Sequence, residues 1–415
     1  MSGPRYVLGL LFTINLVNYM DRQVLYSLLP LIKEDLVLSD SQLGILASAF
    51  MLVYMCAAPL IGCWADRGKR KNWISYGIGI WSFATFASGF ATNFAQLFAA
   101  RAAVGIGESG YGSVSPSFVA EHFSAEKRGR ALAFFSMAIP VGSALGYICG
   151  GWIGHHHGWR SAFMLVGLPG FFLAFLAYFL KDPRDSMPLA QRPPMPRFRD
   201  YLSLYKVRSY VAGTLAMAAM TFALGGLAVW MPTFLTRFWS LNVAEAGTLF
   251  GGITVVSGLF GSLLGGWLGD RLLTKTKKAY FIVSGVGLLL ALPAGVVAVL
   301  SQNYTLTLTA LFAAEFFAFL NMGPLNGVIV NVTSSPMRSM AFAANIFVIH
   351  ALGDAVSPPI IGFVSDHWGL KAGLIGAMVF LGVAGLVCFW GTKYVIEDTE
   401  RQERQEKESL EKAVA

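Results

Sequence analysis

Apolar stretches separated by short polar segments follow one another along almost the whole chain. Each stretch is close to the ~20 residues that an α-helix needs to cross the hydrocarbon core of a bilayer. The pattern predicts an all-α membrane protein with twelve transmembrane helices. Their expected ranges are 6–30, 42–65, 73–92, 95–119, 130–153, 160–180, 209–235, 244–268, 279–300, 304–332, 340–365 and 370–391.

The composition supports this interpretation. Hydrophobic residues make up 55% of the 415 positions and charged residues only 13%. An ordinary soluble domain carries roughly 25% charged residues. The chain is therefore predicted to be an integral membrane protein, which excludes a water-soluble enzyme.

The positive charges predict how the chain is oriented in the membrane. If the N-terminus is cytoplasmic, nineteen Lys and Arg residues fall in cytoplasmic loops and four fall in the loops of the other side. Cytoplasmic loops of membrane proteins carry such an excess. We therefore expect both termini in the cytoplasm and a plasma (inner) membrane location. The same distribution explains the net charge of +8 without a nucleic-acid partner.

The two halves of the sequence repeat one another. GCWADR at 62–67 returns as GWLGDR at 266–271, and the spacing Gly-x4-His-x-Gly-x-(Arg or Lys) that begins at Gly151 returns at Gly362. Duplicated bundles in membranes are typical of transporters. The predicted parts are an N-terminal six-helix bundle (1–180), a cytoplasmic linker (181–208), a C-terminal six-helix bundle (209–392) and a cytoplasmic tail (393–415).

Two copies of one motif identify a superfamily. The pattern Gly-x-x-x-Asp-Arg-x-x-Arg-Lys from Gly62 to Lys71 resembles the helix 2–3 loop signature of the major facilitator superfamily, and Gly266-x-x-x-Asp-Arg resembles its weaker second copy. Lys69 stands where the usual pattern has a glycine. The resemblance implies two pseudo-symmetric six-helix bundles and a gate at their cytoplasmic ends. The implied gate residues are Asp66, Arg67, Arg70, Asp270 and Arg271.

Four further stretches resemble the spinster family within that superfamily. They are NYMDR (18–22), GESGYGS (107–113), AIPVGSALGYICG (138–150) and HALGDAVSPPIIG (350–362). Members of this family move lysophospholipids and sphingolipid phosphates. The resemblance therefore implies a lipid or other amphiphilic small molecule as substrate, and a carrier surrounded by membrane lipids.

A few charged residues are expected at membrane depth. Arg22 and Arg101 are the two basic residues that no loop or tail accounts for. A charge at the bilayer centre costs at least ~2.5 kcal/mol on insertion scales, so it needs a partner or a wet cavity. The candidate proton-coupling or substrate residues are Asp21, Arg22, Arg101, Glu108, Glu315, His350 and Asp354.

The spacing of four of these residues indicates how they act together. Arg101 and Glu108 are seven apart and lie on nearly one face of a helix, whereas Asp21 and Arg22 are adjacent and point in different directions. If helices 1 and 4 pack together, as the resemblance implies, Asp21 lies between Arg101 and Glu108. A cation shared between two carboxylates can change partner when one of them gains a proton. The alternative is that the ion pairs only fix helix packing.

Residues Gly105, Gly107 and Gly110 satisfy G-x-G-x-x-G, a pattern of dinucleotide-binding loops. In such loops a strand precedes the glycines, whereas here they lie inside an apolar stretch. Small residues in a membrane helix let neighbouring backbones approach. We expect these glycines to thin the fourth helix so that Arg101 and Glu108 reach the first.

The sequence thus predicts a secondary transporter of amphiphilic lipids that works by alternating access, is coupled to protons and is a monomer. A transporter of small organic anions with the same fold is the alternative. A membrane-embedded enzyme is disfavoured because neither H-E-x-x-H nor G-x-S-x-G occurs. No cofactor and no metal are expected.

Overall fold

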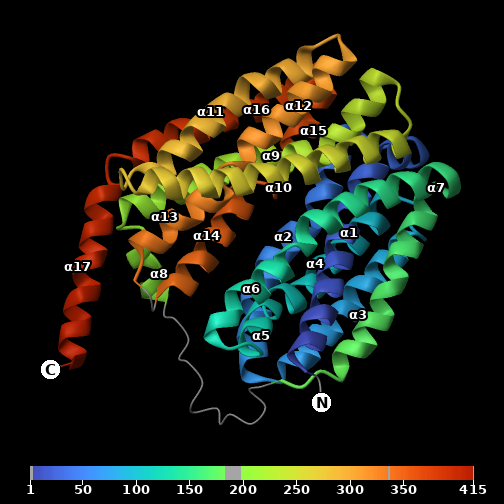
Figure 1. Ribbon diagram of the computed structural model, residues 1–415. Helices are drawn as coiled ribbons and strands as arrows, with labels where there is room; N and C mark the ends of the chain where they lie inside the picture. Colours follow the sequence, from blue (N-terminus) through green and yellow to red (C-terminus); the bar gives the residue numbers. More distant parts are fainter. Residues whose placement is uncertain (1–2, 183–197, 335–336, 415) are drawn as a thin grey trace. The chain divides into compact units, whose positions relative to one another are not determined.

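The structure is a computed structural model that describes residues 3–182, 198–334 and 337–414. Within these residues it contains helices and no strands (Figure 1). The helices are α1 (Pro4–Leu36), α2 (Asp40–Arg67), α3 (Arg70–Ser88), α4 (Phe94–Gly112), α5 (Ser115–Glu121), α6 (Ala125–Ser136), α7 (Ala138–Tyr178), α8 (Phe198–Leu204), α9 (Arg208–Trp239), α10 (Val243–Leu273), α11 (Ala279–Leu300), α12 (Tyr304–Phe319), α13 (Met322–Val332), α14 (Arg338–Leu352), α15 (Ser357–Trp368), α16 (Leu370–Gly391) and α17 (Val395–Val414).

All twelve expected ranges are helical, so the predicted all-α fold is confirmed. Four of the ranges are broken into two helices each. The fourth range is divided into α4 and α5, and the tenth into α12 and α13. The fifth range is divided into α6 and the first part of α7, and the eleventh into α14 and α15. The broken ranges are therefore the corresponding ranges of the two halves, as an internal repeat predicts.

Glycines in the left-handed region mark another repeated joint. Helix α7 runs through Gly158, whose φ of 80° and ψ of 157° are not helical. Gly369, which lies 211 positions later and directly before α16, has a φ of 85°. Residues other than glycine rarely adopt such angles. The fifth and sixth expected spans are thus joined by a one-residue kink, not by a loop.

Within the described residues, eight segments are long and apolar enough to cross a membrane by length and composition alone. One of them, Lys127–Tyr178, holds two of the expected spans. Helices α1, α3 and α4 are not among the eight. The charges of Asp21 and Arg22 interrupt the apolar run of α1, and Arg70 and Lys71 place two charges at the start of α3. Helix α4 is short because it ends at the break before α5.

The chain forms two compact units by its internal contacts. The first joins α1–α7 to the segments Ala228–Val255 and Pro358–Leu370, which follow the predicted linker. The second contains α8, α11–α14, α16 and α17 with the remaining parts of α9 and α10. This grouping reflects contacts that the ends of α9, α10 and α15 make with α1, α2 and α7. The predicted division at 180 and 209 follows the repeat and stays a prediction.

Glycines bring the helices of the first unit together. Helix α1 packs against α7, and α4 packs against α2 and α3. A Cβ added to Gly105 would lie 2.3 Å from the Phe50 carbonyl oxygen of α2, and one on Gly107 would lie 2.4 Å from the Trp81 nitrogen of α3. The glycines therefore serve backbone approach, as predicted. The backbones that approach them belong to α2 and α3. The side chains of Arg101 and Glu108 reach Asp21 and Arg22 of α1, as we expected.

Replacing Gly107 by alanine is expected to destabilise the protein. The added Cβ meets backbone atoms, which cannot move aside as a flexible side chain can, and overpacking of this kind costs about 1–3 kcal/mol. Gly79 of α3 is the matched control, because a Cβ there has no neighbour within 4 Å. Melting temperatures in detergent compare the two variants. A Gly107→Ala protein as stable as Gly79→Ala would contradict the packing described here.

Candidate functional site

A buried ion pair links α1 to α4. The Arg101 Nη1 atom donates to Asp21 Oδ1 at 3.1 Å, and the hydroxyl of Thr85 on α3 donates to the other oxygen of Asp21. Both charged side chains are almost inaccessible, with exposed fractions of 0% for Arg101 and 2% for Asp21. The Arg101 guanidinium also lies 5.6 Å from the centre of the Phe163 ring. The Asp21 carboxylate of α1 therefore accepts hydrogen bonds from residues of α3 and α4.

A second ion pair uses the neighbouring residue of α1. Arg22 approaches Glu108 Oε2 with Nη2 at 2.5 Å and Nε at 2.7 Å. The Glu108 side chain is fully buried, whereas 15% of the Arg22 side chain is exposed. Of the four paired residues, Arg22 thus has the greatest access to its surroundings.

Aromatic rings surround the Arg22 guanidinium. Its central carbon lies 4.9 Å from the ring centre of Tyr19, 5.0 Å from that of Phe50 and 5.7 Å from that of Tyr54. Aromatic faces attract a cation and tolerate apolar groups. The surroundings of Arg22 therefore combine one positive charge with the faces of three aromatic rings.

The network leaves hydrogen-bonding capacity unused. Arg101 Nε and Nη2 and Glu108 Oε1 are buried and have no hydrogen-bond partner within the described part of the chain. A guanidinium has five N–H donors, and a buried polar network is costly when it is only partly satisfied. Arg101 therefore has donors free for a second acceptor, as a residue that changes partner requires.

The sequence predicted which four residues meet, but not how they pair. Asp21, Arg22, Arg101 and Glu108 do lie together in one unit. Glu108, however, is held by Arg22 and Asp21 by Arg101, whereas Asp21 was expected to lie between Arg101 and Glu108. The sequence did not reveal Thr85, because a single threonine in an apolar helix is ordinary and only its position opposite Asp21 gives it significance.

The remaining intramembrane candidates belong to the second unit. Glu315 of α12 is buried and accepts a hydrogen bond from Ser257 Oγ at 3.0 Å. His350 Nδ1 lies 2.8 Å from Asp354 Oδ1, four residues further along the chain, and about a quarter of each side chain is exposed. These residues form two local pairs.

Arg70, a predicted gate residue, forms a compact ionic cluster inside the first unit. Its guanidinium contacts Asp182 at 2.5 Å and Glu121 at 2.7 Å, and the residue is 1% exposed. The two acids come from the segment after α7 and from the end of α5. The motif did not indicate these two acids, because both lie far from it along the chain.

Two further predicted gate residues, Asp270 and Arg271, each contact an aromatic side chain. Asp270 accepts a hydrogen bond from the Tyr280 hydroxyl at 2.8 Å, and the Arg271 guanidinium lies 5.4 Å from the centre of the Trp267 ring. The side chains of Asp66 and Arg67 lie outside the described residues.

Comparison with known proteins places these features in a family. The family model described as Major Facilitator Superfamily matches residues 11–349. Protein spinster homolog 1 of Xenopus tropicalis is 33% identical over 379 residues, which cover 86% of this chain and 72% of the relative. The sphingosine-1-phosphate transporter SPNS2 of Danio rerio is 33% identical over 413 residues, which cover 93% of this chain and 81% of the relative.

Solved structures share the fold. The crystal structure of a bacterial homolog to the human lysosomal transporter spinster, in an inward-facing and unoccupied conformation, superposes with a TM-score of 0.85 at 24% identity and covers 95% of this chain and 98% of its own. The D-xylose–proton symporter gives a TM-score of 0.77 at 17% identity, covering 94% of this chain and 97% of its own.

The fold and its charged intramembrane helices define an integral membrane transporter and not an enzyme. The chain belongs to the major facilitator superfamily and, within it, to the spinster family.

Proposed function

We propose that this transporter carries amphiphilic lipids of the lysophospholipid or sphingolipid-phosphate type, and that protons drive the movement by alternating access. The observation that carries the proposal is the environment of Arg22, a partly accessible guanidinium that lies 4.9 to 5.7 Å from the ring centres of Tyr19, Phe50 and Tyr54. A phosphate matches the planar fork of an arginine, and an acyl chain matches aromatic walls. The name of the SPNS2 relative, a sphingosine-1-phosphate transporter, supports the same substrate class.

The two ion pairs provide the coupling. Arg22 cannot bind a phosphate fully while Glu108 holds it at 2.5 Å. When Glu108 gains a proton, the attraction between the two is lost and Arg22 is released toward the substrate. Arg101, with unused donors, then holds Asp21 and stabilises the rearranged acids. Proton binding and substrate binding are thus linked through Arg22.

The larger parts of the proposal follow the sequence repeat. The halves 1–180 and 209–392 move relative to one another, and the linker 181–208 joins them. In the second half, Glu315, His350 and Asp354 contribute polar groups. Arg70, fixed by Glu121 and Asp182, anchors the cytoplasmic gate that also contains Asp66, Arg67, Asp270 and Arg271. The carrier works as a monomer in the plasma membrane with both termini in the cytoplasm.

Uptake into proteoliposomes tests the substrate class. Purified protein is reconstituted, and the uptake of a fluorescent lysophospholipid, a sphingoid-base phosphate and a small dicarboxylate is compared with protein-free liposomes under an imposed proton gradient. We expect protein-dependent movement of one or both lipids and none of the dicarboxylate. Movement of the dicarboxylate alone would establish the organic-anion alternative and contradict the proposal.

A further inference from the structure

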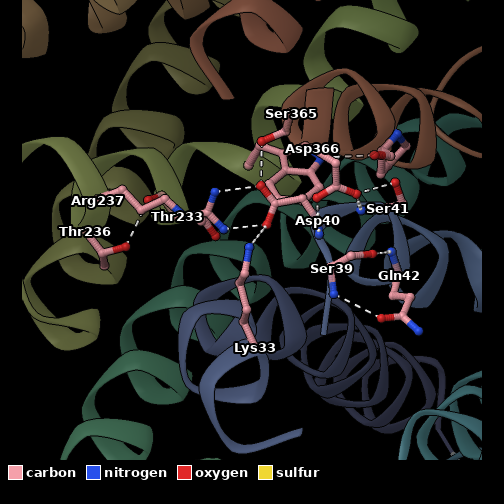
Figure 2. Close-up of polar contacts among 12 residues, drawn as sticks. Lys33, Ser39, Asp40, Ser41, Gln42, Thr233, Thr236, Arg237, Ser365 and Asp366 are labelled. Atoms are coloured by element: carbon pink, nitrogen blue, oxygen red, sulfur yellow. Dashed lines mark hydrogen bonds and ion pairs between the residues drawn. The ribbon is translucent and has the colours of Figure 1, made fainter. Parts of the chain in front are cut away.

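A second charged cluster lies in the first unit and surrounds Asp40, the first residue of α2 (Figure 2). Arg237, in the last turn of α9, donates to both carboxylate oxygens of Asp40 at 2.6 Å. Lys33, in the last turn of α1, contacts the same carboxylate at 2.5 Å, and the Ser365 hydroxyl of α15 donates to it at 2.5 Å. Asp40 is only 3% exposed. This buried carboxylate therefore accepts hydrogen bonds from residues of three other helices.

A second acid reinforces the cluster. Asp366 of α15 accepts from the backbone nitrogens of Asp40 and Ser41 at 2.8 Å each, and from the Ser41 hydroxyl at 2.5 Å. These nitrogens belong to the first turn of α2, where a helix leaves N–H groups unsatisfied and favours a negative charge. The end of α15 is therefore fastened to the beginning of α2 through Asp366.

The helices that meet here touch at glycines. A Cβ on Gly44 of α2 would lie 2.3 Å from the Pro358 carbonyl oxygen, and one on Gly362 of α15 would lie 2.3 Å from the Asp40 carbonyl oxygen. We call this contact of α2 with α15 the first seam. The backbones of α2 and α15 are in direct contact at these glycines, so movement of α15 away from α2 breaks all contacts of the first seam together.

An equivalent seam exists between α7 and α10. A Cβ on Gly151 of α7 would lie 2.4 Å from the Val243 carbonyl oxygen, and one on Gly247 of α10 would lie 2.4 Å from that of Tyr147. Gly151 precedes Gly362 by 211 positions, and Gly247 follows Gly44 by 203 positions. The repeat therefore relates this contact of α7 with α10, which we call the second seam, to the first seam.

The charges distinguish the two seams. The repeat places Val243 of the second seam where the first has Asp40, and places Gly154 and His155 where the first has Ser365 and Asp366. Neither valine nor glycine has a charged side chain that could form an ion pair. A duplicated architecture thus has equivalent glycine contacts at both seams and an acid that gathers cations at only one.

We propose that the Asp40 cluster is the lock of the outer gate, and that it acts at the first seam alone. This inference rests on the alternating access proposed above, and in the proposed orientation the cluster lies on the outer side. Outward opening requires the ends of α9 and α15 to leave α1 and α2, which separates Arg237 and Ser365 from Asp40. Asp40 is the shared acceptor, so neutralising it weakens every contact of the lock except those of Asp366.

Thiol labelling at position 233 tests the lock. Thr233 lies one helical turn before Arg237, is 0% exposed, and its hydroxyl has no partner within the described residues, so cysteine replaces it with little loss (Figure 2). Thr233→Cys is placed in a background whose four native cysteines are replaced by serine, and the protein is held in lipid nanodiscs. Reaction with a membrane-impermeant maleimide then reports how often this end opens.

Asp40→Asn is expected to accelerate labelling about tenfold or more, because it removes the ionic partner of two cations while keeping the side chain's shape. Glu245→Gln is the matched control. Glu245 forms a capping box with Asn242 at the start of α10, the position that corresponds to Gln42 in the capping box of α2. Because glutamine serves in the cap of α2, Glu245→Gln should keep the cap of α10 and leave labelling unchanged. Arg237→Lys should accelerate labelling less than Asp40→Asn, since it keeps the charge but loses the paired contact.

An Asp40→Asn protein that elutes as a single species, melts like the parent and labels at the parent rate would overturn the lock. If Asp40→Asn does not fold, Arg237→Gln replaces it, because this change removes the cation that reaches Asp40 from α9 and leaves Lys33 on the acid; labelling no faster than the parent would then overturn the proposal. The assay uses neither substrate nor proton gradient. Failure of lipid transport would therefore leave this result standing, and the reverse also holds.

Discussion

Alanine at position 22 is expected to abolish binding of lipid phosphates. Arg22 is the partly accessible cation of the site, with rings on several sides and Glu108 as its partner. Truncating one member of a buried charge pair costs about 2–5 kcal/mol or more in binding, which corresponds to a loss of roughly 30-fold to several thousandfold. The change also leaves the buried Glu108 carboxylate without its cation. Quenching of tryptophan fluorescence by a titrated sphingoid-base phosphate measures the affinity.

Arg22→Lys separates the contribution of charge from that of shape. Lysine keeps the positive charge but lacks the planar fork that engages a phosphate with two parallel bonds. We expect intermediate affinity for this variant. An Arg22→Ala protein that binds the lipid within about twofold of the unsubstituted protein would remove Arg22 from the substrate site and return the Arg22–Glu108 pair to a purely structural role.

Asparagine at position 21 is expected to uncouple transport from protons. Asp21 is 2% exposed and is held by Arg101 and Thr85, so the neutral amide preserves its shape and imitates a permanently protonated acid. Lipid counterflow, which needs no proton movement, should continue. Accumulation driven by a proton gradient should fall at least about tenfold, because the acid no longer exchanges a proton with the two sides.

Counterflow and gradient-driven uptake are measured on the same proteoliposomes. Glu34→Gln is the matched control, because Glu34 is an exposed acid on the same helix. It should keep full coupling. Gradient-driven accumulation by Asp21→Asn equal to that of the control would exclude Asp21 from coupling.

The sequence revealed the helices and the charged residues because both follow from local physical constraints. An apolar stretch of membrane length has few alternatives to a helix. A charge inside such a stretch is costly enough that Asp21, Arg22, Arg101 and Glu108 were identified without any knowledge of their contacts. The glycines around Glu108 were likewise separated from a nucleotide-binding loop by the apolar stretch that contains them.

What the sequence did not reveal depends on how helices are rotated and which distant segments meet. Pairing of Arg22 with Glu108 depends on the direction of a side chain, which spacing along one helix does not determine. The Asp40 lock brings together residues up to 326 positions apart. Lys33 and Arg237 are two of the four basic residues that the sequence places in the loops of the non-cytoplasmic side. The Ser39–Gln42 capping box indicates where α2 begins but not which cations approach it.

If a lipid and a proton move together through this carrier, lipid uptake must change the pH inside a closed liposome. Proteoliposomes loaded with a pH-sensitive dye start with equal pH on both sides, and a sphingoid-base phosphate is then added outside. We expect a change of internal pH that accompanies lipid uptake, is abolished in Asp21→Asn and does not occur in protein-free liposomes. Protein-dependent lipid uptake with no change of internal pH would contradict it.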